Sequence, residues 1–183
     1  FQAERMKLVI LDRDGVINFD SVHFIKSPAE WKAIPGSVEA IARLTQAGYR
    51  VVVASNQSGI DRGLFDMDTL NAIHDKMQRT VKTAGGRIDA IFYCPHSADS
   101  NCDCRKPKPG MLLRIADCFS VDLPGVYVVG DSLRDLKAAA AAGAKPVLVL
   151  SGKLKSADEE KDIPEDTIVF NDLAAFVDRL LKS

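Results

Sequence analysis

The sequence predicts a Rossmann-like α/β fold, in which a central parallel sheet lies between two layers of helices. Apolar runs rich in β-branched residues alternate with longer helix-like segments along the chain. This alternation favours parallel strands, because each helix carries the chain back across a face of the sheet. The chain has 183 residues, 46% hydrophobic and 27% charged, which is typical of one folded domain. We assign that domain to residues 7–183 and expect residues 1–6 to be a disordered or cloning-derived start.

The predicted strands are short apolar runs bounded by turn residues or by polar residues. The first, Leu8–Leu11, contains four apolar residues in succession, as expected of a strand that is covered on both faces. It ends directly at Asp12. The six expected strands cover residues 8–11, 49–54, 88–93, 126–129, 146–150 and, as a short edge strand, 167–170.

The predicted helices combine helical spacing of apolar residues with recognisable ends. Val38, Ile41 and Leu44 share one helix face, and Gly48 then ends the helix. Pro109 opens a later helix, because proline is tolerated in a first turn. The expected helices cover residues 37–47, 67–84, 109–119, 133–142 and 173–181, and the charged segment 153–166 is interpreted as a surface loop.

Polar residues follow four of these strands. In doubly wound sheets, ligands bind beyond the carboxyl ends of the strands, near the point where strand order reverses. Asp12 and Asp14 follow the first strand, Ser55–Gly59 the second, a cysteine-rich segment the third, and Gly130-Asp131-Ser132 the fourth. We therefore expect one site at this edge of the sheet.

Asp12 and Asp14 are the strongest candidates for catalysis. Residues two apart in extended chain point the same way, so both face one pocket. Two adjacent carboxylates repel each other unless a cation or a shared proton lies between them. Asp131 offers a third carboxylate for a hard divalent cation, although it could also cap a helix. Asp135 lies one helical turn further on, where it could bind a metal-bound water or orient Lys106.

The segment after the third strand contains Cys94, His96, Cys102 and Cys104 within eleven residues. Three thiolates and one imidazole match a closed structural zinc site. A disulfide or a chance cluster is the alternative. Elsewhere, Cys118 and Trp31 are expected in the core.

A basic turn, Arg105 to Gly110, follows the cysteines. A fixed cation such as Lys106 suits a transferring phosphoryl group, and the Ser55 hydroxyl could bind another phosphoryl oxygen. Arg62 and Arg105 would reach the rest of an anionic substrate, unless they are simply solvated loop charges.

Composition excludes several classes of protein. The net charge is −1 and like charges form no long block, which disfavours a nucleic-acid or membrane-surface binder. No apolar stretch is long enough to span a bilayer. The clustered cysteines favour a reducing, cytoplasmic setting, and the lack of an apolar surface stripe favours a monomer.

Four segments resemble the motifs of the haloacid dehalogenase superfamily of phosphohydrolases. In chain order, the first is Asp-x-Asp-Gly, which begins at Asp12, and the second and third are Ser55 and Lys106. The fourth is Gly-Asp-x-x-x-Asp, which begins at Gly130, and the resemblance spans Lys7 to Leu150. It implies that Asp12 is the nucleophile and Asp14 the general acid and base, with Lys106 and Ser55 on the phosphoryl oxygens. It also implies magnesium, held by Asp12, Asp131 and the main-chain carbonyl of Asp14, and a fold without a cap domain.

More narrowly, the zinc segment and Asn56-Gln57-Ser58-Gly59 look like those of the superfamily members that remove the C7 phosphate of D-glycero-D-manno-heptose 1,7-bisphosphate. That reaction belongs to the synthesis of ADP-heptose for the lipopolysaccharide core. Histidinol-phosphate phosphatase is the alternative, although its loop typically reads Asn-Gln-Asp-Gly. The residues expected to contact such a phosphorylated sugar are Arg13, Asn18, Asp20, His23, Asn56, Gln57, Ser58, Arg62 and Arg105.

Overall fold

The computed structural model describes residues 5–182 and contains a six-stranded sheet with the strand order β3-β2-β1-β4-β5-β6. All five pairs of neighbouring strands are parallel, as predicted. The order reverses beside β1, because β2 lies on one side of it and β4 on the other. The strands are β1 (Leu8–Leu11), β2 (Arg50–Asn56), β3 (Ala90–Cys94), β4 (Tyr127–Gly130), β5 (Lys145–Val149) and β6 (Ile168–Phe170).

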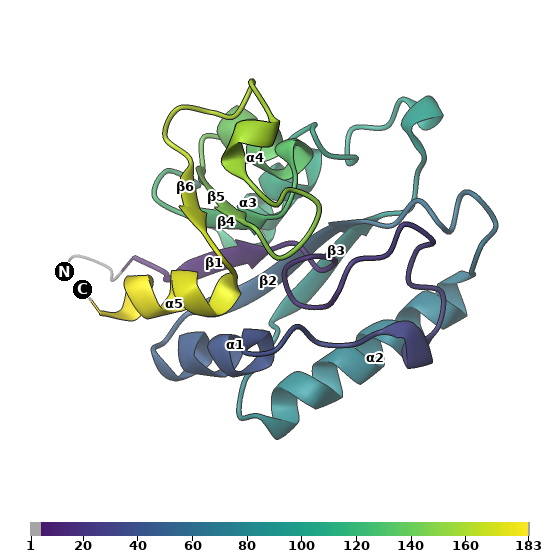
Figure 1. Cartoon of the computed structure of the whole chain (residues 1–183), viewed down its shortest axis with the longest axis horizontal. Coiled ribbons are helices and arrows are strands. Elements are labelled where there is room, and N and C mark those ends of the chain that lie inside the picture. The colour runs from purple at the N-terminus through teal and green to yellow at the C-terminus, as the bar shows by residue number, and fades with distance from the viewer. Residues whose placement is uncertain (1–4, 183) are drawn as a thin grey trace.

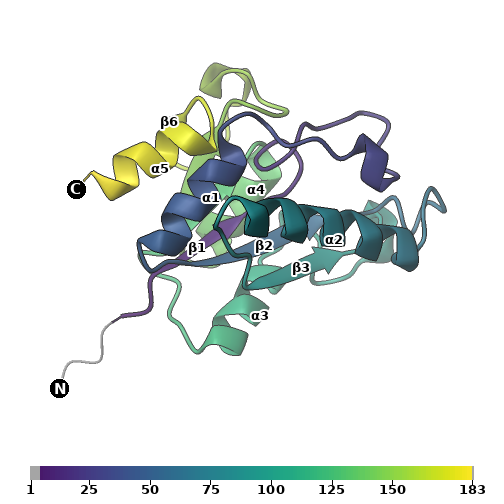
Figure 2. The same cartoon turned by 90° about the horizontal axis from the view of Figure 1, so that it is seen from below.

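Helices cover both faces of this sheet (Figures 1 and 2). Val9 and Leu11 of β1 pack with apolar residues of α1, α2 and α5 on one face. Leu8 and Ile10 pack with α3 and α4 on the other face. This alternation is the period of two that an extended strand imposes, and it produces the predicted three layers. The helices are α1 (Ser37–Gln46), α2 (Met67–Thr83), α3 (Gly110–Phe119), α4 (Leu133–Ala141) and α5 (Leu173–Leu181).

Most predicted boundaries are confirmed to within two residues, and two of the differences matter. β2 continues through Ser55 to Asn56, so these two polar residues belong to the strand. Short 3₁₀ helices at Pro28–Glu30, Ala98–Ser100 and Ala157–Glu159 were not predicted. Three residues are too few to show helical periodicity in a sequence.

The core expectation is confirmed for Trp31, which is 2% exposed. It is wrong for Cys118, which is exposed. The buried residues of α3 are Met111, Leu112 and Ile115, and Cys118 lies beyond them in the last turn.

The connections between strands within residues 5–182 are short helices and loops, with no inserted domain among them. Helices long and apolar enough to cross a membrane are likewise absent from this part of the chain. The expected start, residues 1–6, falls mostly outside the described residues. Arg5 is described, and its guanidinium donates a hydrogen bond to the Pro124 carbonyl.

Candidate active site

The predicted site lies at the carboxyl ends of β1, β2 and β4. The main-chain N–H of Asp12 donates to the Val129 carbonyl at 2.9 Å, which joins the end of β1 to the end of β4. The chain then turns at Gly15, whose φ is +82°. A Cβ at Gly15 would overlap the carboxylate of Asp131. Glycine is therefore required here both by the backbone angle and by the close approach of Asp131.

A cluster of three carboxylates and one lysine forms the floor of the site. One oxygen from each of Asp12, Asp131 and Asp135 lies within 4.8 Å of the others. The Lys106 ammonium lies 3.3 Å from Asp12 Oδ1 and 2.7 Å from Asp135 Oδ1. Asp135 Oδ2 accepts hydrogen bonds from the N–H groups of Asp131 and Ser132 and from the Ser132 hydroxyl. With both its oxygens engaged, Asp135 is placed to orient Lys106.

The electrostatics of this cluster favour the binding of a cation. Burial, together with the charge of Asp135, raises the pKa of Asp12 to about 7. Burial and the charges of Asp12 and Asp135 raise the pKa of Asp131 to about 9. Lys106 offsets only part of this repulsion. A divalent cation bound by oxygen atoms would supply the rest, so the residues present fit magnesium.

Asp14 lies beside this cluster and is held by three neighbouring side chains. Its Oδ1 accepts hydrogen bonds from Arg13 and Asn18, and its Oδ2 accepts one from Gln57 at 3.1 Å. Gln57 also donates to the Ser55 hydroxyl at 2.8 Å. Burial would raise the pKa of Asp14, but the Arg13 guanidinium and these hydrogen bonds hold it below its usual value.

Asn56 fixes the position of Lys106 through the main chain. The Asn56 side-chain oxygen accepts from the Lys106 N–H at 3.0 Å, and its amide donates to the Lys106 carbonyl at 3.2 Å. The strand end of β2 therefore holds the loop that follows β3. Burial alone would lower the pKa of Lys106, but the carboxylates of Asp12 and Asp135 raise it, so the lysine stays charged.

The loop after β5 closes over Asp131. The N–H of Lys153 donates to Asp131 Oδ2 at 2.9 Å, and the Ser151 hydroxyl donates to the Gly15 carbonyl at 2.8 Å. A Cβ at Gly152 would overlap the Asp131 side chain. The orientation of Asp131 therefore depends on a loop that the sequence analysis interpreted as surface.

We expect Gly152→Ala to raise the magnesium concentration needed for half-maximal activity by about tenfold, because ligand-orienting contacts typically change metal affinity by that order. The added methyl group must displace the Asp131 carboxylate. Magnesium titration of the phosphohydrolase activity that the sequence motifs imply measures the effect. Lys155→Ala, in the same loop, is the control and should leave the magnesium requirement unchanged. An unchanged requirement in Gly152→Ala would contradict the role given to this contact.

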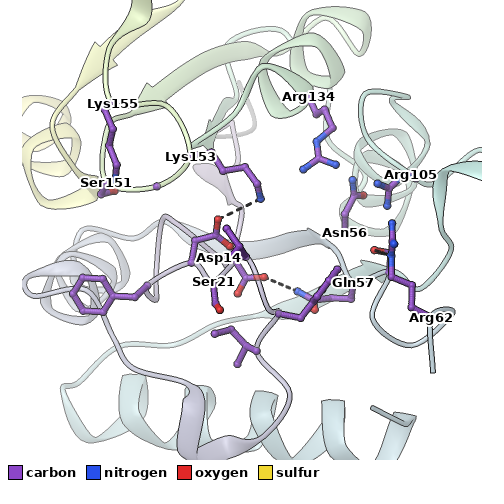
Figure 3. Close-up of a pocket in the computed structure, with 17 residues that line it drawn as sticks. Asp14, Ser21, Asn56, Gln57, Arg62, Arg105, Arg134, Ser151, Lys153 and Lys155 are labelled. Atoms are coloured by element: carbon purple, nitrogen blue, oxygen red, sulfur yellow. Dashed lines mark hydrogen bonds and ion pairs between the residues drawn. The ribbon is translucent and has the colours of Figure 1, made fainter. Parts of the chain in front are cut away.

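A cleft of about 640 Å³ opens above the carboxylates. Its lining shares Asp14, Asn56, Arg134 and Lys153 with the small recess that contains Asp12, Lys106 and Asp131. Five cations and two carboxylates line the cleft, which gives it a positive character. Figure 3 shows Arg62, Arg105 and Arg134 gathered at one end and Lys155 at the other. These cations are Arg62, Arg105, Arg134, Lys153 and Lys155.

The structure places most of the predicted substrate residues around this cleft, but not all of them. Asp20, Asn56, Gln57, Ser58, Arg62 and Arg105 line it. The side chains of Arg13 and Asn18 are fully buried and bond to Asp14, so they do not face a substrate. His23 lines a neighbouring hollow, beside Lys26 and Glu30, that shares Asp20 and Ser21 with the cleft. The prediction that Arg13 and Asn18 contact substrate is therefore wrong, whereas substrate contact by His23 stays a prediction.

Sequence reasoning missed Arg134, Lys153 and Lys155. Arg134 stands in the first turn of α4, directly after the end of β4. Lys153 and Lys155 follow β5, whose carboxyl end lies at the same edge of the sheet. The signal was present, because each is a cation that closely follows a strand end.

Three of the four predicted zinc ligands lie together. The sulfur of Cys102 lies 3.6 Å from that of Cys94 and 3.7 Å from that of Cys104. The sulfurs of Cys94 and Cys104 are also in contact, with their Cα atoms 5.6 Å apart. Within residues 5–182, His96 is not part of this cluster, and it is exposed.

This fold and this site define a phosphoric monoester hydrolase of the haloacid dehalogenase type. Residues 103–176 match the family model described as HAD-hydrolase-like. The chain is 59% identical over 177 residues to the D-glycero-β-D-manno-heptose-1,7-bisphosphate 7-phosphatase of Bordetella bronchiseptica, covering 97% of this chain and 99% of that protein. It is 54% identical over 176 residues to the enzyme of the same name from Pseudomonas putida, covering 96% of this chain and 100% of that one.

A solved structure extends this similarity to three dimensions. The crystal structure of the B. bronchiseptica D,D-heptose 1,7-bisphosphate phosphatase, complexed with magnesium and phosphate, superimposes with a TM-score of 0.95 at 59% identity. The match covers 97% of this chain and 99% of that one. The chain belongs to the family of the D-glycero-β-D-manno-heptose-1,7-bisphosphate 7-phosphatases, within the haloacid dehalogenase-like hydrolases.

Proposed function

We propose that the protein removes the C7 phosphate of D-glycero-β-D-manno-heptose 1,7-bisphosphate in the cytoplasm, acting as a monomer. One observation carries the proposal. The recess with Asp12 and Lys106 opens directly into a cleft with a cluster of arginines, so the site offers two separate positions for phosphate groups. The names of the similar enzymes support the choice of sugar and anomer.

In the proposed reaction, a carboxylate oxygen of Asp12 attacks phosphorus. An aspartyl-phosphate bond forms, and the bond between phosphorus and the C7 oxygen breaks. Asp14, which must carry a proton once the substrate is bound, gives it to the departing C7 oxygen. Asp14 then accepts a proton from the water that cleaves the aspartyl-phosphate, which restores both side chains and releases phosphate.

Further residues would bind the transferring phosphoryl group. Lys106 and the Ser55 hydroxyl would hold its oxygens, where negative charge builds up in the transition state. Asp12, Asp131 and the main-chain carbonyl of Asp14 would hold magnesium, which would supply positive charge to offset that of the phosphoryl group. Asp135 keeps Lys106 in place through their 2.7 Å contact.

The arginine cluster would hold the second phosphate. Burial, followed by the nearby charges of Arg134 and Arg62, lowers the pKa of Arg105, so both of these guanidinium groups lie close enough to repel that of Arg105. A phosphate dianion between them would relieve that repulsion. Planar guanidinium groups also match phosphate oxygens in pairs.

A substrate panel tests the proposal. Magnesium-dependent phosphate release is measured from both anomers of heptose 1,7-bisphosphate, heptose 7-phosphate, histidinol phosphate, fructose 1,6-bisphosphate and a nucleoside monophosphate. The β-bisphosphate should give the highest kcat/KM. Arg134→Gln should raise KM for the bisphosphate about tenfold, as expected on losing one charged contact, with little change for the monophosphate. A preference for histidinol phosphate would instead favour the alternative and contradict the proposal.

We also propose that the cysteine cluster holds a structural zinc ion. In reduced protein these cysteines would offer thiolates within a few ångströms of one another, and thiolates are good zinc ligands. The imidazole of His96, two residues from Cys94, would supply the fourth ligand. Such an ion would order the loop that leads to Arg105, whose guanidinium donates to the His96 carbonyl at 3.2 Å.

Zinc analysis of protein purified in reducing buffer should find about one ion per chain in the wild type. Cys102→Ser should lose the zinc and lower the melting temperature, because metal binding contributes to folding. Cys118→Ser, which alters the other free cysteine, is the matched control and should keep the zinc. Wild-type protein without zinc and with only two titratable thiols would support the Cys94–Cys104 disulfide and refute the zinc site.

A further inference from the structure

Arg13 is a charged residue with no access to solvent. Its side chain is fully buried although it stands between two residues of the active site. Its Nε and Nη2 both donate to Asp14 Oδ1, at 3.0 and 2.9 Å. This forked contact fixes the guanidinium against a single oxygen of the proposed general acid and base.

The far side of the guanidinium contacts His74, in the middle of α2. Arg13 Nη1 lies 3.1 Å from His74 Nε2, across 61 residues of chain. Arginine can only donate hydrogen bonds, so Nε2 of His74 must be the acceptor and the imidazole must be neutral. Burial, and then the charge of Arg13, lowers the pKa of His74 to about 4, which agrees with this protonation state.

These contacts make the two oxygens of Asp14 different. Oδ1 accepts three N–H groups, two from Arg13 and one from Asn18 at 2.9 Å. Oδ2 accepts only the Gln57 amide, and Asp14 lines both the cleft and the catalytic recess. Because Oδ1 is saturated, Oδ2 is the oxygen left to exchange a proton with the leaving group or with water.

We propose that His74 is a positioning residue of the active site: it holds the Arg13 guanidinium in the orientation that saturates Asp14 Oδ1 and leaves Oδ2 for proton transfer. The inference rests on the proposed role of Asp14. If His74 cannot accept, Arg13 Nη1 is left without a partner in a buried setting, which is costly for a charged donor. The guanidinium must then shift, and the carboxylate that it grips shifts with it.

The test compares two substrates whose leaving groups differ in how much they need protonation by a general acid. The sugar alkoxide is a poor leaving group and needs the general acid, whereas the phenolate of p-nitrophenyl phosphate leaves almost unaided. The ratio kcat/KM reports the steps up to the first phosphoryl transfer. His74→Phe keeps a ring but removes the acceptor, and His74→Gln keeps an acceptor at a similar reach. If His74→Phe does not fold, His74→Leu, which also lacks an acceptor, provides the same comparison.

We expect the variant without an acceptor to lose about tenfold in kcat/KM on the heptose bisphosphate, the scale seen when a supporting contact of a catalytic group is removed. On p-nitrophenyl phosphate the loss should be less than about threefold, since proton donation contributes little there. His74→Gln should restore most of the activity. Equal losses on both substrates, no loss on either, or no rescue by glutamine would overturn the proposal.

Asp14→Asn separates this proposal from the one on which it rests. If that variant shows a much larger loss on the sugar than on p-nitrophenyl phosphate, Asp14 is the general acid and the His74 result can be interpreted as above. If Asp14→Asn loses activity equally on both substrates, the proposed role of Asp14 fails, whatever the His74 variants do. Circular dichroism and melting temperatures of all variants show whether each is folded.

Discussion

Asp12→Asn is expected to reduce phosphate release from the heptose bisphosphate by about 10⁴-fold or more, because an amide cannot form the covalent phosphoenzyme. Asparagine has nearly the same shape, so the loss would report chemistry and not packing. Steady-state assays at saturating magnesium measure it. Asp117→Asn makes the same chemical change at an exposed position on α3 and should leave activity unaltered. Near wild-type activity in Asp12→Asn would show that another group is the nucleophile.

The same substitution should stabilise the magnesium-free protein. Carboxylate oxygens of Asp12, Asp131 and Asp135 lie within 4.8 Å of one another, and Lys106 offsets only part of their negative charge. Removing one negative charge lowers their mutual repulsion. The melting temperature without magnesium should therefore rise in Asp12→Asn, and added magnesium should raise it less than in the wild type, because a ligand is missing.

The second large effect is expected from Lys106→Met. The substitution removes the cation proposed to bind the transferring phosphoryl group, and kcat/KM should fall by about 10² or more, as is typical on losing one group that stabilises transition-state charge. It also leaves Asp135 buried without its ion-pair partner. We expect a loss of about 3 kcal/mol or more in the free energy of unfolding, the usual cost of breaking a buried pair on one side.

Denaturant unfolding and steady-state kinetics measure the two losses separately. Lys153→Met is the matched control for stability: its ammonium also pairs with an aspartate, at 3.3 Å from Asp20, but the lysine side chain is 47% exposed. Exposed pairs contribute little, so Lys153→Met should change stability by less than about 1 kcal/mol. A Lys106→Met variant as stable as the wild type would contradict the buried Lys106–Asp135 pair.

The architecture could be predicted from the sequence because its signals are local. Apolar runs and helical spacing predicted each strand and each main helix, and parallel pairing followed from their alternation. The convergence of Asp12, Ser55 and Asp131 was predictable for the same reason, since parallel strands bring their carboxyl ends to one edge.

Side-chain direction was harder to predict, and Arg13 shows why. The alternation that turns Asp12 and Asp14 toward the pocket also turns the residue between them away. Its burial was thus implied by the reasoning that selected its neighbours. His74 gave no comparable signal, because its partner stands 61 residues earlier in the chain. Contacts of this range depend on how the helices pack on the sheet, which periodicity does not specify.

The loop after β5 determines how late in synthesis of the chain the enzyme can become catalytically active. Every residue proposed to take part in the chemistry lies at or before Asp135, yet the N–H that orients Asp131 comes from Lys153. A nascent chain that has emerged only as far as α4 carries all the catalytic side chains without that support. The metal site can then reach its final geometry only after β5 has joined the sheet, so activity should appear late in biosynthesis, close to completion of the fold.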